Sequence, residues 1–133
     1  MTEEPDDATL AFAHRMFDLA REGGADELAA QVDAGLPPNL TNAKGDTLLI
    51  LAAYHARPAT VAALLARGAD PARVNDRGQT ALVAAVFRQS AEAVTALLDA
   101  GADPAAGAPS ALETAVFFEL PDMQELLERH RPR

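Results

Sequence analysis

Very few side chains in this sequence have the type and spacing that acid–base, nucleophilic or metal chemistry requires. The three histidines, His14, His55 and His130, lie far apart, and none stands four residues from another histidine on one helix face. The chain has no cysteine, and its two serines, Ser90 and Ser110, stand in expected turn or cap positions. Because no nucleophile or base has an orienting partner, we predict that the protein is not an enzyme and has no catalytic, metal or cofactor site.

Two aspartates look like a pair of functional carboxylates, but their sequence context indicates a structural role. Asp70 and Asp103 occur in the same tetrapeptide, Gly-Ala-Asp-Pro, at residues 68–71 and 101–104. A side chain that recurs with its whole turn is expected to brace that turn, since aspartate hydrogen-bonds readily to nearby backbone N–H groups. The informative feature is therefore the repeated unit that contains these residues.

A period of 33 residues runs through most of the chain, and each unit predicts two helices. The residues that recur at this interval are Gly35, Gly68 and Gly101, Gly45 and Gly78, Thr47 and Thr80, and the dipeptides Leu64-Leu65 and Leu97-Leu98. Thr47 and Thr80 follow glycine-containing turns and stand where helix N-caps are needed. Pro58 suits the first position of a second helix, which Gly68 is expected to end.

The composition favours a helical chain over any sheet protein. Apolar residues make up 49% of the 133 residues, but alanine supplies 31 and leucine 17, whereas valine and isoleucine together supply only eight. Alanine and leucine favour helices, and β-branched residues favour sheets. Pairs such as Ala52-Ala53 and Ala84-Ala85 are small enough to let neighbouring helices pack closely.

The charge and hydropathy of the chain exclude two classes of partner. The formal net charge is −9, and residues 1–41 hold nine acidic residues against two basic ones. Nucleic-acid binding needs a positive surface, so we expect no nucleic-acid partner. No apolar run approaches the roughly 18 residues of a membrane span, and the acidic N-terminus does not resemble a signal peptide. We therefore expect a cytoplasmic protein with no membrane partner, whose acidic end is either a solvated surface or a patch for a basic partner.

Residues 42–74 and 75–107 resemble the ankyrin repeat in period and in sequence. Both begin Asn-x-x-Gly-x-Thr-x-Leu and end Ala-Leu-Leu-x-x-Gly-Ala-Asp-Pro before a short tail. The resemblance implies an all-α ankyrin-repeat solenoid of about four stacked helix pairs, joined by short β-turn or hairpin loops and capped by its terminal repeats. Ile50 and Val83 stand where the family places a histidine that links adjacent turns, so we expect apolar packing to replace that link.

The same resemblance divides the chain into one domain and a tail. We expect a disordered acidic tail at residues 1–8 and a single domain at residues 9–130. Its repeats are expected at 9–41, 42–74, 75–107 and 108–130. The glycine that the family places between its two helices is Ala56 in one repeat, and Gln89 with Ser90 stands there in the next.

Ankyrin-like arrays bind proteins through their turn tips and first helices, so the resemblance implies where a partner would bind. Four of the six aromatic residues fall at the end of the first helices, where the repeats differ in sequence. The candidate partner-binding residues are Tyr54, His55, Phe87, Arg88, Phe117 and Phe118 on the helices, and Lys44, Asp46, Arg77 and Gln79 at the turn tips. We expect Tyr54, Phe87 and Phe117 to stack along one edge of a concave groove. The alternative is that these rings fill the core between repeats.

These patterns predict a non-enzymatic protein–protein interaction module whose concave face binds a protein partner that the sequence does not identify. Two alternatives remain: a structural or assembly subunit of an oligomer, and an accessory or immunity-type protein for a bacterial enzyme or toxin. A monomer is expected, with a homo-oligomer left open. Ten arginines against one lysine are typical of a GC-rich bacterial genome.

Overall fold

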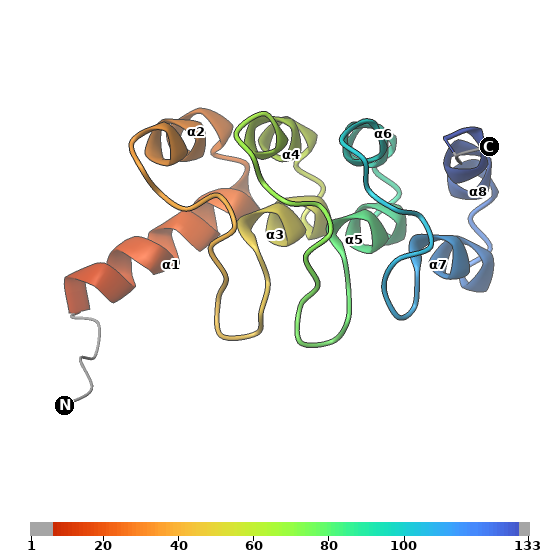
Figure 1. Ribbon diagram of the computed structural model, residues 1–133, viewed down its shortest axis with the longest axis horizontal. Helices are drawn as coiled ribbons and strands as arrows, with labels where there is room; N and C mark the ends of the chain where they lie inside the picture. The colour runs from red at the N-terminus through yellow and green to blue at the C-terminus, as the bar shows by residue number, and fades with distance from the viewer. Residues whose placement is uncertain (1–6, 131–133) are drawn as a thin grey trace.

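The computed structural model describes residues 7–130, which form eight α-helices arranged as four antiparallel pairs (Figure 1). The helices are α1 (Asp7–Glu22), α2 (Ala25–Asp33), α3 (Leu48–Tyr54), α4 (Pro58–Leu65), α5 (Ala81–Phe87), α6 (Ala91–Asp99), α7 (Ala111–Phe117) and α8 (Pro121–Arg129). The odd-numbered helices form an inner row and the even-numbered helices an outer row, with long loops hanging below the inner row. The prediction of an all-α solenoid of four helix pairs is confirmed.

Helix α1 begins earlier than the sequence predicts. Its first residue is Asp7, so two residues of the expected tail are helical. Residues 1–6, the rest of that tail, lie outside the described residues.

The helices begin at the capping residues that the sequence predicts. The hydroxyl of Thr47 accepts a hydrogen bond of 3.0 Å from the backbone N–H of Ile50, and Thr80 does the same for Val83 at 3.2 Å. Each bond satisfies an N–H group that has no partner within its own helix. Pro58 is the first residue of α4, where a missing N–H group costs nothing.

The core is a continuous layer of alanine, leucine and valine between the two rows of helices. Ala52, Ala53 and Ala85 are fully buried, which brings neighbouring inner helices close together. Leu64 and Leu97 fill the space between the rows from the outer helices, at equivalent positions of two repeats. One pair cannot bury both of its faces, so the stack of pairs forms the core.

The loops between repeats form hairpins that a polar network joins. The side-chain amide of Asn75 donates hydrogen bonds of 2.9 Å to Asp46 in the preceding hairpin and to Gln79 in its own. The backbone N–H of Asp76 donates to the carbonyl oxygen of Lys44 at 3.0 Å. Polar bonds therefore join the hairpins in addition to the apolar packing that was expected to replace the missing histidine link. Ile50 and Val83 are buried, but buried polar groups also join the hairpins.

Left-handed backbone conformations occur at predicted glycines and also at three residues that have side chains. Gly68 and Gly101 follow their helices with φ of 92° and 94°, as predicted for helix C-caps. The turns between paired helices place Ala56, Gln89 and Glu119 at φ of 54°, 56° and 53°. In this region a side chain crowds its own backbone, so these three turns are strained.

The repeated aspartates brace their turns. A carboxylate oxygen of Asp70 accepts a hydrogen bond from the backbone N–H of Ala72, and Asp103 does the same for Ala105, both at 2.9 Å. The predicted structural role of this pair is confirmed.

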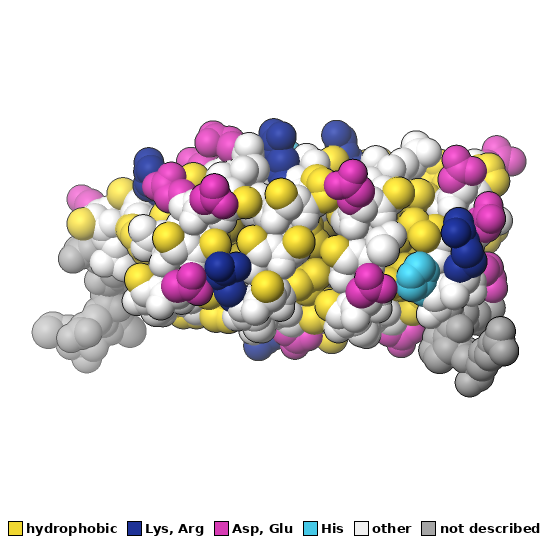
Figure 2. All heavy atoms as spheres, turned by 90° about the horizontal axis from the view of Figure 1, so that it is seen from above, with side chains coloured by type: hydrophobic (Ala, Val, Ile, Leu, Met, Phe, Trp, Pro, Cys, Tyr) yellow, Lys and Arg dark blue, Asp and Glu magenta, His cyan; other side chains and the backbone are white. Residues whose placement is uncertain are grey.

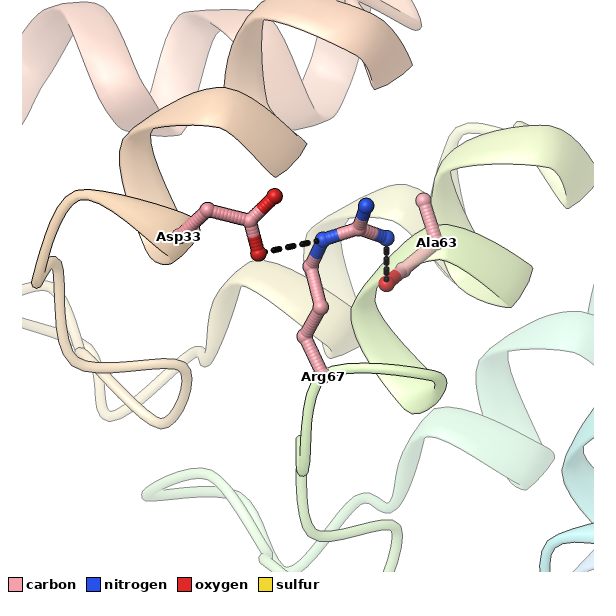
Figure 3. Close-up of polar contacts among 3 residues, drawn as sticks. All are labelled: Asp33, Ala63 and Arg67. Carbon is pink, nitrogen blue, oxygen red and sulfur yellow. Dashed lines mark hydrogen bonds and ion pairs between the residues drawn. The ribbon is translucent and has the colours of Figure 1, made fainter.

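The outer face carries charged side chains of both signs scattered among small apolar ones, without a large patch of either sign (Figure 2). Several of these charges link neighbouring repeats. Arg67 donates from Nε to a carboxylate oxygen of Asp33 and from Nη1 to the carbonyl oxygen of Ala63, both at 3.0 Å (Figure 3). This bridge joins the last residue of α2 to the turn that follows α4.

Candidate protein-binding groove

A groove of about 860 Å³ runs along the hairpin side of the inner helices. One wall consists of the tips of the two hairpins, residues 42–46 and 75–79. The other wall consists of side chains along α1, α3 and α5 and of Pro109, Thr114 and Phe118 in the fourth repeat. The groove therefore crosses all four repeats, and the second and third repeats contribute both a hairpin tip and a first helix to it.

Three aromatic rings form a row on the helix wall of the groove. Tyr54 and Phe87 stack with their ring centroids 6.3 Å apart and their planes 11° from parallel. Phe118 meets Phe87 edge-on, with centroids 5.4 Å apart. Tyr54, Phe87 and Phe118 are 44%, 45% and 49% exposed. The rings thus contact one another and still present about half their surface to solvent, so they do not fill the core between repeats. We call Tyr54, Phe87 and Phe118 the aromatic row.

The expectation that Phe117 continues the stack from Phe87 was wrong. The ring in contact with Phe87 is that of Phe118, and Phe117 lies edge-on against Phe118 at 4.9 Å. Phe117 is 79% exposed and does not line the groove. Successive residues at a helix end point in directions about 100° apart, so only one of the two rings can face Phe87.

The hairpin tips contribute two exposed cations and two bonded polar groups. Lys44 and Arg77 are exposed, line the groove and make no ion pair with any described residue. Asp46 also lines the groove, but its side chain is buried and accepts the hydrogen bond of Asn75. Gln79 is half-buried and accepts from the same amide group. Asp46 therefore braces the hairpins, which corrects the expectation that it faces a partner.

His55 lies at the end of the aromatic row, where arginines surround it. Its ring meets that of Tyr54 edge-on, with centroids 5.4 Å apart. Partial burial lowers the pKa of His55, and the positive charges of Arg21, Arg88 and Arg57 lower it further. The imidazole is therefore neutral at pH 7, and the local positive charge comes from the arginines.

Arg21 and Arg57 also belong to this region, and neither is among the binding residues predicted from sequence. Arg57 donates from Nε to the backbone carbonyl oxygen of Arg21 at 2.9 Å, which ties the second repeat to the first. Arg21 is half-buried and lines the groove. A signal was present for Arg21, since it aligns with Tyr54 and Phe87 at the 33-residue period. Arg88, which was predicted, is exposed beyond the groove, next in sequence to Phe87.

Residues 7–130 were compared with the requirements of a metal site and of a membrane span. In this part of the chain, no three histidine, aspartate or glutamate side chains gather closely enough to hold a metal ion. No helix in it is long and apolar enough to cross a membrane.

Comparisons with known proteins agree with this architecture. A family model described as ankyrin repeats, in three copies, matches residues 16–107. A protein of Pseudomonas aeruginosa, itself described only by its ankyrin repeats, is 49% identical over 65 residues. That alignment takes in 46% of this chain and 38% of the relative, so the chain matches well under half of that protein's length. The family model covers more than half of the chain, and the protein belongs to the ankyrin-repeat family.

Proposed function

We propose that this protein is a non-enzymatic interaction module that binds another protein in the groove between the hairpin tips and the inner helices. Ankyrin repeats generally mediate protein–protein interaction. The aromatic row supports this groove as the binding site, because its three touching rings are each about half exposed. Large exposed aromatic surfaces are costly in water and are enriched at the centres of protein interfaces.

The groove suits a partner because its wall is already in place. The aromatic row stands on α3, α5 and the end of α7, whose backbones are held by the buried alanine core. A ring fixed before binding loses little conformational freedom when the partner arrives, and this increases affinity. The proposed roles are anchoring contacts for Tyr54, Phe87 and Phe118 and polar rim contacts for Lys44 and Arg77.

The remaining predicted residues have supporting places in this proposal. Gln79 supports the second hairpin, and Asp46 supports it through Asn75. His55 packs against the ring of Tyr54. Arg88 lies beyond the row, where it would contact a partner that extends past the groove.

The experiment is affinity capture from the native cell, with the captured proteins identified by mass spectrometry. The wild-type chain is compared with Phe87→Ala and with the matched control Phe12→Ala. Phe12 is 43% exposed on α1 and does not line the groove, whereas Phe87 is 45% exposed within it. We expect a partner that the wild type and Phe12→Ala retain and Phe87→Ala loses. A partner retained equally by both variants, with both folded by circular dichroism, contradicts the proposal.

A second candidate function, an assembly subunit, rests on the C-terminal end of the stack. Val116 aligns with Val86 when the two helices are aligned on their caps, Thr80 and Ser110. Val86 is fully buried, but Val116 is 64% exposed. An oligomer would cover Val116 and the neighbouring Phe117. In that case the mass measured by light scattering would exceed 13.9 kDa and would fall to that of a monomer in Val116→Asp.

A further inference from the structure

The cations of the described chain fall into two groups that occupy different places. Five arginines pair with carboxylates: Arg15 with Glu27, Arg21 with Asp18, Arg67 with Asp33, Arg73 with Asp70, and Arg129 with Glu125. The cations without an ion pair to any residue in 7–130 are Lys44, Arg57, Arg77 and Arg88. Lys44, Arg77 and Arg88 are therefore available to charges that the chain itself does not supply, and so are the terminal nitrogens of Arg57, whose Nε is bonded to the carbonyl oxygen of Arg21.

The unpaired cations lie on both sides of the aromatic row. Lys44 and Arg77 line the groove from the hairpin tips. Arg57 and Arg88 lie just past the C-terminal ends of α3 and α5, where Tyr54 and Phe87 are the last helical residues. Neither arginine lines the groove itself, and Arg88 directly follows Phe87 in the chain.

The carboxylates of the groove do not neutralise these cations. Asp18 is paired with Arg21 at 3.0 Å, and Asp46 is buried and holds the amide of Asn75. The unpaired charges that line the groove are therefore two cations, Lys44 and Arg77. The exposed carboxylate of Asp76 lies beside Gly45 on the hairpin tips but outside the groove lining, and the whole chain has a net charge of −9. Salt screens charges beyond about 10 Å, so contact in the groove depends on the local cations and not on the net charge.

We propose that the partner presents an acidic segment whose carboxylates flank an aromatic or other large apolar side chain. This inference rests on the proposed function, because it describes what the groove would bind. The apolar side chain would contact the aromatic row, and the carboxylates would pair with Lys44 and Arg77 on one side and with Arg57 and Arg88 on the other. A basic segment would leave these cations unpaired and repelled.

A single-stranded nucleic acid also combines negative charge with groups that stack on aromatic rings, but the charge of this chain disfavours it. A nucleic acid carries a negative charge at every nucleotide and meets the potential of the whole surface over a long stretch. The chain is acidic overall and offers four unpaired cations within residues 7–130. A short acidic segment needs only these local cations.

The test is a display selection of random twelve-residue peptides on the full chain, followed by fluorescence anisotropy of the selected peptides. We expect peptides rich in aspartate and glutamate with an aromatic or large aliphatic residue among them. The double variant Lys44→Glu/Arg77→Glu should weaken binding about tenfold or more, since it turns two attractions into repulsions. The control Arg15→Glu/Arg129→Glu changes the net charge equally, away from the groove, and should weaken binding less than threefold.

The possible results separate this inference from the proposed function. Peptides that lose affinity with Phe87→Ala but are basic or neutral overturn the inference and leave the proposed function standing. Peptides that bind Phe87→Ala as well as the wild type overturn both. Equal weakening by the two charge-reversed variants, tighter binding of a single-stranded oligonucleotide, or a dimer of this chain that masks the groove also overturns the inference.

Discussion

Three turns place a residue other than glycine in the left-handed backbone region, and we predict that glycine at those positions stabilises the protein. Ala56, Gln89 and Glu119 have φ between 53° and 56°, where an L-residue costs about 1–2 kcal/mol relative to an ordinary conformation. Glycine removes this cost but loses about 0.5–1 kcal/mol through the greater freedom of the unfolded chain. The net gain is about 0.5–1 kcal/mol at each turn.

The three turns belong to different helix pairs, so their gains should add. We expect the free energy of unfolding of the triple variant Ala56→Gly/Gln89→Gly/Glu119→Gly to be about 1.5–3 kcal/mol higher than that of the wild type. The assay is urea unfolding followed by circular dichroism, in which the midpoint should rise while the slope stays unchanged.

A matched control is the same substitution in a helical conformation. Ala66 caps α4 with φ of −62° and ψ of −18°, a conformation that alanine adopts without strain. Ala66→Gly should therefore lower the free energy of unfolding by about 0.5–1 kcal/mol. Ala56→Gly and Ala66→Gly should thus have opposite signs. Equal destabilisation by both variants would refute the reasoning.

Three further predictions concern single sites. Thr60→Val should raise the free energy of unfolding by about 1 kcal/mol in urea titration, because the Thr60 hydroxyl is buried without a hydrogen-bond partner in the described chain; a lower stability would contradict this. Gly45→Ala should lower the free energy of unfolding by about 1–3 kcal/mol, because Gly45 has φ of +76° and a methyl group there would lie 2.6 Å from the Asp76 carboxylate. An unchanged urea midpoint would show that the hairpins are not closely fitted. The pKa of His55 is lower in the folded chain than the ordinary value of 6.5, so the folded state disfavours its protonation. Neutral His55 therefore makes its whole contribution to the free energy of unfolding above pH 6.5. That contribution is lost as the pH falls through the pKa of His55 in the folded chain. His55→Gln should remove that part of the pH dependence, and NMR titration of the ring should give a pKa below 6.5.

The fold could be predicted from sequence because each repeat encodes its own local structure. Thr47 and Thr80 cap helices by bonding within one turn, and Gly68 ends a helix through its own backbone. Such signals act over a few residues and recur every 33 positions, so the period alone aligns them. The alanine pairs then indicate how closely the units stack.

The details of the groove could be predicted only in part, because they depend on contacts between repeats. Alignment placed aromatic residues at the groove but wrongly selected Phe117 in place of Phe118 as the ring that turns toward Phe87. Asp46 is at a variable turn position, and only the neighbouring Asn75 makes it a buried brace. The availability of Lys44 likewise depends on which carboxylates other repeats place beside it.

The most direct test of the account is the affinity of the captured partner for Phe87→Ala compared with Phe12→Ala, measured by isothermal titration calorimetry. Removing a central aromatic anchor costs about 2 kcal/mol or more, which corresponds to a rise in Kd of about thirtyfold. We predict that rise for Phe87→Ala and less than a threefold change for Phe12→Ala. Equal Kd values for the two folded variants would show that the partner binds outside the groove.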